Sequence, residues 1–203
     1  MTTIRHMPQE IVSMVYSGTV KNCTVRNAII KARPHYTSVN TSIGGPGGIV
    51  SIMAGGTVEG CTVDENTVIS GVSQMKYEGI AGSQQDGHVF AGGVVARMYK
   101  VTGYPNMGSV KNNACYAQIE AENNSFGNGT LLVGGIIGKI SGSNLPTISS
   151  NHYSGTDYGI GYDLGGNATD EPGCIKDGGS NNNTGNGNDN NGGVSGFIGR
   201  RRL

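Results

Sequence analysis

Three short sequence blocks recur along the chain in the same order, and this repetition limits the fold more than any other feature. The first block is Gly18–Val25 (GTVKNCTV), which returns as Gly56–Val63 (GTVEGCTV), as Gly108–Cys115 (GSVKNNAC) and, more degenerate, as Pro146–Tyr153 (PTISSNHY). Internal repetition of this kind is the sequence signature of stacked repeat architectures. The repeating units therefore begin near residues 18, 56, 108 and 147.

Two further blocks lie between these copies. A Gly-Gly block occurs at Gly47–Ser51, Gly92–Ala96 and Gly134–Gly138, and a third block at Ala28–Ala32, Thr67–Gly71 and Ala117–Ala121. The blocks are rich in Val, Ile and Thr and are bounded by Gly, Asn or Asp, which is typical of short strands joined by turns. Strands that return at a fixed period predict a coil wound around one axis. We therefore predict an all-β fold, a right-handed parallel β-helix (β-solenoid) of Gly-rich repeats.

The chain divides into three regions on this interpretation. Residues 18–177 are the predicted β-helix. Residues 1–17 are a predicted N-terminal cap, with a short helix over Pro8–Tyr16 where apolar residues follow a helical spacing. Residues 178–203 are a predicted flexible tail, because 13 of the 16 residues from 178 to 193 are Gly or Asn. Two longer segments, Ser73–His88 and Tyr99–Met107, are predicted to project as loops.

One position of the first block carries small residues in every copy: Cys23, Cys61, Asn113 and Asn151. We interpret it as an inward-facing stack in which asparagines hydrogen-bond to one another; the alternative is a turn position that accepts any small residue. Three blocks with their connections overfill one turn of a thin solenoid, so we expect two coils per repeat. Cys23 and Cys61 would then lie about 10 Å apart, too far for a disulfide, and we expect buried free thiols.

The composition narrows the classes of partner. Charged residues make up only 14% of the chain, the formal net charge is zero and glycine supplies 36 residues. No broad cationic field is available for nucleic acid, and no apolar run approaches the length of about 20 residues that spans a membrane. No secretory signal is visible near the start, so we expect a fragment or a processed form of a longer polypeptide.

Residues that could carry catalysis or bind metal do not form a recognisable pattern. The four histidines form no HExxH motif and the four cysteines no CxxC pair, so we expect neither metal nor cofactor. Glycoside hydrolysis needs paired carboxylates. The candidate carboxylates do not recur between repeats: Asp64, Glu65, Asp86, Asp157, Asp163, Asp170 and Glu171. We therefore expect no catalytic site.

The pairing of the Gly-Gly block with the Gly-Thr-Val block resembles the GLUG-type repeats of bacterial surface proteins. The carriers are Gly48–Ser51, Gly93–Ala96 and Gly135–Gly138, each followed by a strand of the form Thr/Ser-Val/Ile-x-x-Cys/Asn. Ile or Val replaces the family's Leu, and the third copy alone keeps the final Gly. Such repeats occur in adhesin-like proteins and beside the peptidase region of some IgA-cleaving metallopeptidases. The resemblance covers roughly residues 18–165 and implies an extracellular parallel β-helix within a longer chain.

These observations predict a non-catalytic segment of a bacterial cell-surface or secreted protein, acting as a stalk or as an adhesive surface for host glycan or protein. The predicted contact residues are Tyr77, Tyr99 and Tyr104, since tyrosine offers a large contact area at low entropic cost. The alternative is a carbohydrate-active parallel β-helix enzyme, similar to polysaccharide lyases or hydrolases.

Overall fold

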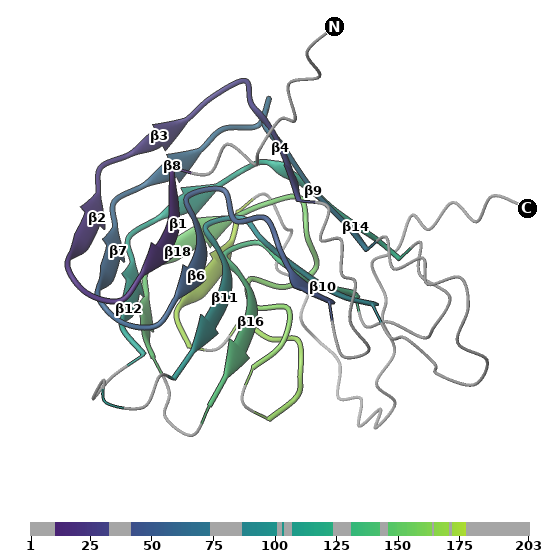
Figure 1. The fold of residues 1–203 in the computed structure, drawn as a ribbon. Coiled ribbons are helices and arrows are strands. Elements are labelled where there is room, and N and C mark those ends of the chain that lie inside the picture. Colours follow the sequence, from purple (N-terminus) through teal and green to yellow (C-terminus); the bar gives the residue numbers. More distant parts are fainter. Residues whose placement is uncertain are drawn as a thin grey trace, which may run out of the picture.

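The structure is a computed structural model that describes residues 11–32, 42–73, 87–100, 103, 107–123, 131–142, 146–163, 165–170 and 172–177. Every regular element in these ranges is a strand, so the protein is all-β as predicted. All pairing between the named strands is parallel (Figure 1). The predicted tail from residue 178 onward lies outside the described residues.

The strands assemble into five sheets, A to E. Sheet A contains β1 (Val12–Val15), β6 (Val50–Met53), β11 (Val95–Tyr99) and β16 (Ile137–Ser141). Sheet B contains β2 (Thr19–Lys21), β7 (Thr57–Glu59), β12 (Ser109–Lys111) and β17 (Thr147–Ser149). Sheet C contains β3 (Thr24–Val25), β8 (Thr62–Val63), β13 (Ala114–Cys115), β18 (Asn151–Tyr153) and β19 (Cys174–Lys176). Sheet D contains β4 (Ile29–Ala32), β9 (Val68–Ser73) and β14 (Gln118–Asn123), and sheet E contains β5 (Ser42–Gly44), β10 (Gly87–Gly92) and β15 (Leu131–Gly134).

The chain passes through sheets A, B, C, D and E in that order and then returns to sheet A. Val12 pairs with Val50, Val50 with Val95, and Val95 with Ile137, so equivalent residues of successive repeats lie side by side. One repeat therefore makes one circuit, and the prediction of two coils per repeat is wrong. The physical reason is that five short strands share each circuit, which leaves an interior wide enough for large apolar side chains.

The single circuit places Cys23 and Cys61 side by side, each immediately before one of the paired strands β3 and β8, with the Thr62 N–H donating to the Cys23 carbonyl at 2.9 Å. All four cysteines are nevertheless free, as predicted. Burial is confirmed for Cys61, Cys115 and Cys174 but not for Cys23, which is half-buried. The reason is that β3 is the edge strand of sheet C, so no further strand covers Cys23 on one side.

The predicted capping helix is also wrong where it can be checked. Val12–Val15 form strand β1, which pairs with β6 in sheet A. Val12 and Val15 are β-branched, and pairing along an existing strand satisfies the backbone groups of this segment. The apolar spacing that resembled a helix arises because Val15 packs into the core from a strand. Residues 1–10 of the predicted cap lie outside the described residues.

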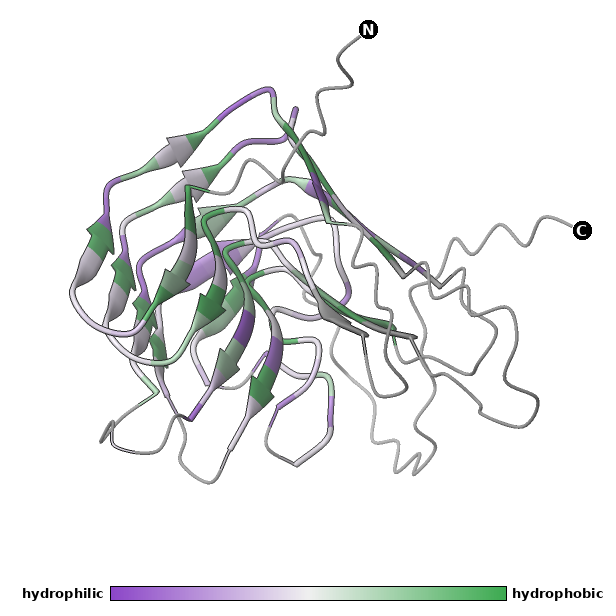
Figure 2. Ribbon diagram, in the orientation of Figure 1, coloured by the Kyte–Doolittle hydropathy of each residue, from purple (hydrophilic) through white to green (hydrophobic). Residues whose placement is uncertain are grey.

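The core is one continuous apolar cluster to which all five sheets contribute. The central residue of each sheet B strand after the first points inward and is buried: Val58, Val110 and Ile148. Figure 2 shows apolar and polar residues alternating along these short strands. This alternation is expected where one face of each strand packs on a core. Burial of the larger side chains contributes about 1.5–3 kcal/mol each.

The Gly-Gly block forms the corner between sheets E and A, and it packs too tightly for any side chain. A Cβ atom on Gly93 would lie 1.9 Å from the carbonyl oxygen of Gly135 and 2.4 Å from Cys115 Sγ. The equivalent atom on Gly48 would lie 2.1 Å from the carbonyl oxygen of Gly93, and the one on Gly135 would lie 2.2 Å from a ring carbon of Tyr153. The second glycine of each pair is thus required because successive corners stack directly upon one another.

The turn between sheets B and C recurs with the same backbone conformation. One residue at this turn has a positive φ in every circuit: Asn22 at 56°, Gly60 at 64°, Asn112 at 55° and Ser150 at 52°. Gly173 at 78° adds a fifth copy, since β19 pairs with β18. Asn and Gly tolerate this region better than other residues. This turn residue comes immediately before the position that holds Cys23, Cys61, Asn113 and Asn151, which we call the Cys/Asn position.

The Cys/Asn position itself faces inward and forms a hydrogen-bonded ladder. The Asn113 side-chain amide donates to Asn151 Oδ1 at 2.9 Å and to the Val58 carbonyl at 3.1 Å. Asn113 Oδ1 accepts the Cys61 N–H at 2.9 Å, and the Asn151 amide donates to the Val110 carbonyl at 2.9 Å. Both asparagines are almost fully buried. The predicted inward stack is confirmed, and the simple turn interpretation is wrong.

Candidate functional site

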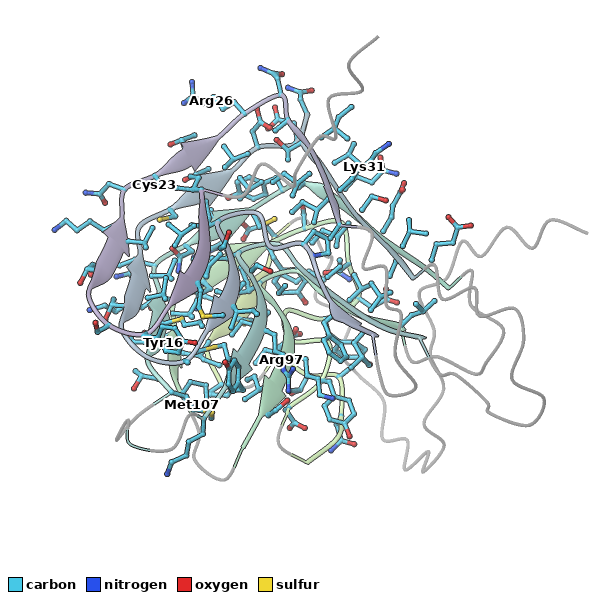
Figure 3. The ribbon with its side chains drawn as sticks, in the orientation of Figure 1. Tyr16, Cys23, Arg26, Lys31, Arg97 and Met107 are labelled. Carbon is cyan, nitrogen blue, oxygen red and sulfur yellow. The ribbon has the colours of Figure 1, made fainter. Side chains whose placement is uncertain are left out.

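A column of side chains crosses the outer face of sheet A. Strand register aligns Met14 with Ile52, Ile52 with Arg97, and Arg97 with Lys139. All four are partly or fully exposed to solvent, whereas Met98, beside Arg97 in the chain, is completely buried. Because side chains alternate between the two faces of a strand, Arg97 and Lys139 both point outward. They come from adjacent strands, whose backbones are about 4.8 Å apart. Figure 3 shows Arg97 at the strands of sheet A.

Aromatic rings surround these two cations. The Arg97 guanidinium carbon lies 5.1 Å from the centre of the Tyr99 ring and 5.8 Å from that of Phe90. Lys139 Nζ lies 4.6 Å from the centre of the Phe90 ring and 5.0 Å from that of Tyr162. Both cations are within the range of attraction to an aromatic ring. Phe90 thus lies within reach of both charges, and Tyr99 and Tyr162 each contact one of them. We call Arg97, Lys139, Phe90, Tyr99 and Tyr162 the cation–aromatic patch.

No carboxylate in the described ranges pairs with the charges of this patch. The strands of sheets A and E contain no Asp or Glu. Within the described ranges, ion pairs join Lys111 to Glu59 and His152 to Asp177, and neither Arg97 nor Lys139 takes part in one. Positive charge therefore accumulates here although the chain as a whole is neutral.

Burial acts on both cations, and the positive charge of Arg97 acts on Lys139 as well. Burial lowers the pKa of the Arg97 guanidinium, and burial together with the charge of Arg97 lowers the pKa of Lys139. Arg97 Nε and Ser141 Oγ are buried and make no hydrogen bond within the described part of the chain. Such donors reduce stability when they lack a partner. The patch therefore holds positive charge and polar atoms that no group in the described part of the chain neutralises.

Tyr16 extends the patch toward the first strand of sheet A. Val15, Met53 and Met98 align across the sheet, so Tyr16 and Tyr99 lie on either side of the small residue Ala54. A hydrogen bond with Tyr99 raises the pKa of the Tyr16 hydroxyl. Tyr16 is 39% exposed, as is Met14 in the neighbouring column. The face therefore combines aromatic rings, hydroxyl groups and two cations.

Of the predicted contact residues, Tyr99 belongs to this patch. It ends strand β11 rather than starting a projecting loop, because Arg97 to Tyr99 continue the pairing with β16. Tyr77 and Tyr104 lie outside the described residues, as do most of the two segments predicted to project. Ser73 ends β9, and His88 lies in β10.

Sequence reasoning missed Arg97, Lys139, Phe90 and Tyr162. A signal for the two cations was present, since each stands at the same distance from its Gly-Gly pair: GGVVAR from Gly92 and GGIIGK from Gly134. Extending the Gly-Gly block by one residue would have aligned them. Nothing in the repeat pattern indicated that Phe90 and Tyr162 would reach them, because those contacts depend on how sheet E and the last circuit pack against sheet A.

Three of the seven carboxylates considered for catalysis accept hydrogen bonds that hold the local structure. Asp64 accepts the Thr67 hydroxyl at 2.7 Å, and Asp163 accepts the backbone N–H groups of Gly165 and Asn167 at 2.8 and 2.9 Å. Asp170 accepts the buried Tyr153 hydroxyl at 2.6 Å and the Gly159 N–H at 2.8 Å. These bonds give Asp64, Asp163 and Asp170 a structural role, whereas Asp86 and Glu171 lie outside the described residues. In the described ranges, His, Cys, Asp and Glu side chains form no group of three or more that could hold a metal ion.

A second polar cluster lies on the outer face of sheet C. His152 Nδ1 lies 2.9 Å from Asp177 Oδ1, and the Tyr116 hydroxyl donates to Asp177 Oδ2 at 3.1 Å. The hydrogen bond with His152, and after it the one from Tyr116, lowers the pKa of Asp177. These two contacts fasten the end of β19 to the neighbouring chain segments of sheet C.

Comparison with known protein families, with curated protein sequences and with solved structures finds no match. No helix in the described part of the chain is long and apolar enough to cross a membrane. The class that the structure defines is an all-β protein of stacked parallel sheets.

Proposed function

We propose that this chain is a right-handed parallel β-helix that serves as a non-catalytic, extracellular or cell-surface segment of a bacterial protein. In this role it is a rigid stalk that presents an adhesive face to a host glycan or protein. The repeated circuit through five parallel sheets and the resemblance of its blocks to GLUG-type repeats support the architecture.

The observation that carries the binding role is the cation–aromatic patch. Arg97 and Lys139 are unpaired by carboxylates in the described ranges, and tyrosines flank them on an outer sheet face. Arg and Tyr are the residue types most enriched where proteins bind partners. We therefore assign the adhesive surface to sheet A.

The interior supports the stalk role. Backbone hydrogen bonds join successive circuits at the Gly-Gly corner, from Gly48 to Gly92 at 3.2 Å and from Gly93 to Gly134 at 3.0 Å. The buried asparagine ladder joins the same circuits at the opposite corner, between sheets B and C. Because each circuit is bonded to the next at several places, bending would break many contacts at once. Such a body presents its outer faces at fixed positions.

The test is binding and turnover on one panel of immobilised polysaccharides and extracellular matrix proteins. We expect the protein to be retained by at least one member without cleaving any of them. The double variant Arg97→Ala/Lys139→Ala should lose retention. Lys111→Ala, which removes a paired cation from sheet B, should keep it. Cleavage of a polysaccharide would instead establish the carbohydrate-active enzyme, and retention by no member would refute the adhesive role.

A further inference from the structure

We propose that the cation–aromatic patch binds an anionic saccharide chain, whose carboxylate or sulfate groups contact Arg97 and Lys139 while its sugar rings lie against the flanking tyrosines. This inference rests on the proposed adhesive function and specifies its ligand class. It requires that the two cations act together, that the aromatic residues add contact area, and that the face disfavours uncharged ligands.

Charge complementarity is the first argument. Arg97 and Lys139 are in register on adjacent strands, and the charge of Arg97 disfavours the charged form of Lys139. An anion between or above them would reduce that repulsion and replace the carboxylate partner that neither has in the described ranges. Hydrogen bonds between ionised groups are about twice as strong as neutral ones. The patch is therefore better suited to an anionic ligand than to a neutral one.

The direction of the column gives the second argument. Met14, Ile52, Arg97 and Lys139 follow one another across the strands, at one residue per strand. A linear chain lying along this column would meet two cations and then an apolar stretch, with a spacing of about 4.8 Å between rows. A polymer with regularly spaced anionic groups fits such a row better than a single compact anion does.

The flanking aromatic residues favour sugar over an acidic peptide. Tyr99 and Tyr162 stand beside the cations, and the hydrogen bond between Tyr16 and Tyr99 places phenol hydroxyls at the same face. A sugar ring has an apolar C–H face and a rim of hydroxyls, and tyrosine offers a matching apolar ring with a polar tip. With two cations on this face and zero net charge overall, the chain lacks the broad positive field that nucleic acid requires.

The experiment measures the affinity of the full chain for four probes by calorimetry at about 50 mM salt, where screening is weak. The probes are a galacturonate hexamer, a sulfated heparin hexasaccharide, the neutral maltohexaose and a hexaglutamate peptide. We expect one or both anionic saccharides to bind, and maltohexaose and hexaglutamate to bind at least tenfold more weakly. The galacturonate and heparin measurements decide whether the anionic group is a carboxylate or a sulfate.

Variants then locate the site. Arg97→Gln and Lys139→Gln should each weaken saccharide binding by roughly tenfold to a hundredfold, the size of one charge-assisted hydrogen bond. Lys111→Gln on sheet B should change the affinity less than twofold, and circular dichroism melts confirm that every variant is folded.

The inference would be overturned if maltohexaose bound as tightly as the anionic saccharides, or if hexaglutamate bound more tightly than they do. The adhesive face would remain in place in either case. Saccharide binding that survives both glutamine substitutions would also overturn the inference. Failure of all four probes would overturn it too, and the broader panel above then decides separately whether the adhesive function stands.

Discussion

Two columns of equivalent residues cross the strands of this protein, one inside and one outside. The inner column, at the corner of sheets B and C, holds Cys23, Cys61, Asn113, Asn151 and Cys174. The outer column on sheet A holds Met14, Ile52, Arg97 and Lys139. The inner column has small side chains throughout, and each of its asparagine amides is hydrogen-bonded. The outer column changes from apolar to cationic residues, and its charges lack carboxylate partners in the described ranges.

The two columns are under different physical constraints, because one is buried and the other faces solvent. An unpaired polar group costs free energy when it is buried, so the inner column admits residues that satisfy one another. The outer column is exposed to solvent on one side, so its residues can vary between circuits with little effect on stability. We therefore expect substitutions in the interior to change the free energy of unfolding, and those in the outer column to change binding.

The largest loss of stability is expected for Gly93→Ala. The added Cβ would lie 1.9 Å from the Gly135 carbonyl oxygen, so the backbone of two circuits must move apart. We expect the free energy of unfolding to fall by about 3 kcal/mol or more, measured by urea denaturation. Gly165→Ala is the control, since its nearest neighbours are side-chain atoms of Asn167 and Asp163 at 3.1 Å and beyond rather than backbone. Equal losses in the two variants would show that the corner is not tightly packed.

A smaller loss is expected for Asn113→Ala, which removes the central member of the ladder. The Cys61 N–H and the Val58 carbonyl would each lose a buried partner. We expect a loss of about 2–4 kcal/mol in the same urea experiment. Asn113→Cys, which introduces the residue found at the equivalent position in the previous circuit, should lose less. A loss below about 1 kcal/mol for the alanine variant would contradict the stabilising role of the ladder.

Extending the ladder should be nearly neutral. In Cys61→Asn the new amide would reach the Val20 carbonyl, which Cys61 Sγ already contacts at 3.9 Å, and would donate to Asn113 Oδ1. We expect the free energy of unfolding to stay within about 1 kcal/mol of that of the parent chain. Val58→Asn puts the same amide at a fully buried apolar position and should lose about 2–4 kcal/mol. If both variants lose equally, the column has no special tolerance for asparagine.

The smallest effect on stability is expected in the outer column. Arg97→Met keeps an apolar side chain against Phe90 and Tyr99 and removes the buried Nε that has no hydrogen bond in the described part of the chain. Loss of the cation–aromatic attraction, about 0.5–1 kcal/mol at such sites, opposes that gain. We expect unfolding free energy to change by less than about 1 kcal/mol while saccharide binding is lost. A loss of 3 kcal/mol would mean that Arg97 is a structural residue.

Much of the fold could be predicted because its repeats reveal which residues share a position. The Val, Ile and Thr blocks correspond to real strands, and the alignment of Cys61 with Asn113 correctly indicated an inward column. The number of coils per repeat could not be read in the same way, since a repeat length is compatible with either one wide circuit or two narrow ones. A helix was predicted over Pro8–Tyr16, which contains strand β1, because so short a segment carries too little pattern to separate a strand from helical turns.

The candidate site, like the fold, could be predicted from the sequence only in part. Tyr99 was predicted as a contact residue of a projecting loop, and it belongs to the patch, but its cationic neighbour Arg97 was not predicted. The local sequence determines which side chains alternate inward and outward, because that depends only on strand geometry and turn residues. The contacts of Phe90 and Tyr162 with Arg97 and Lys139 depend on the tertiary structure. Residues far apart in the chain become neighbours only when whole circuits stack in register.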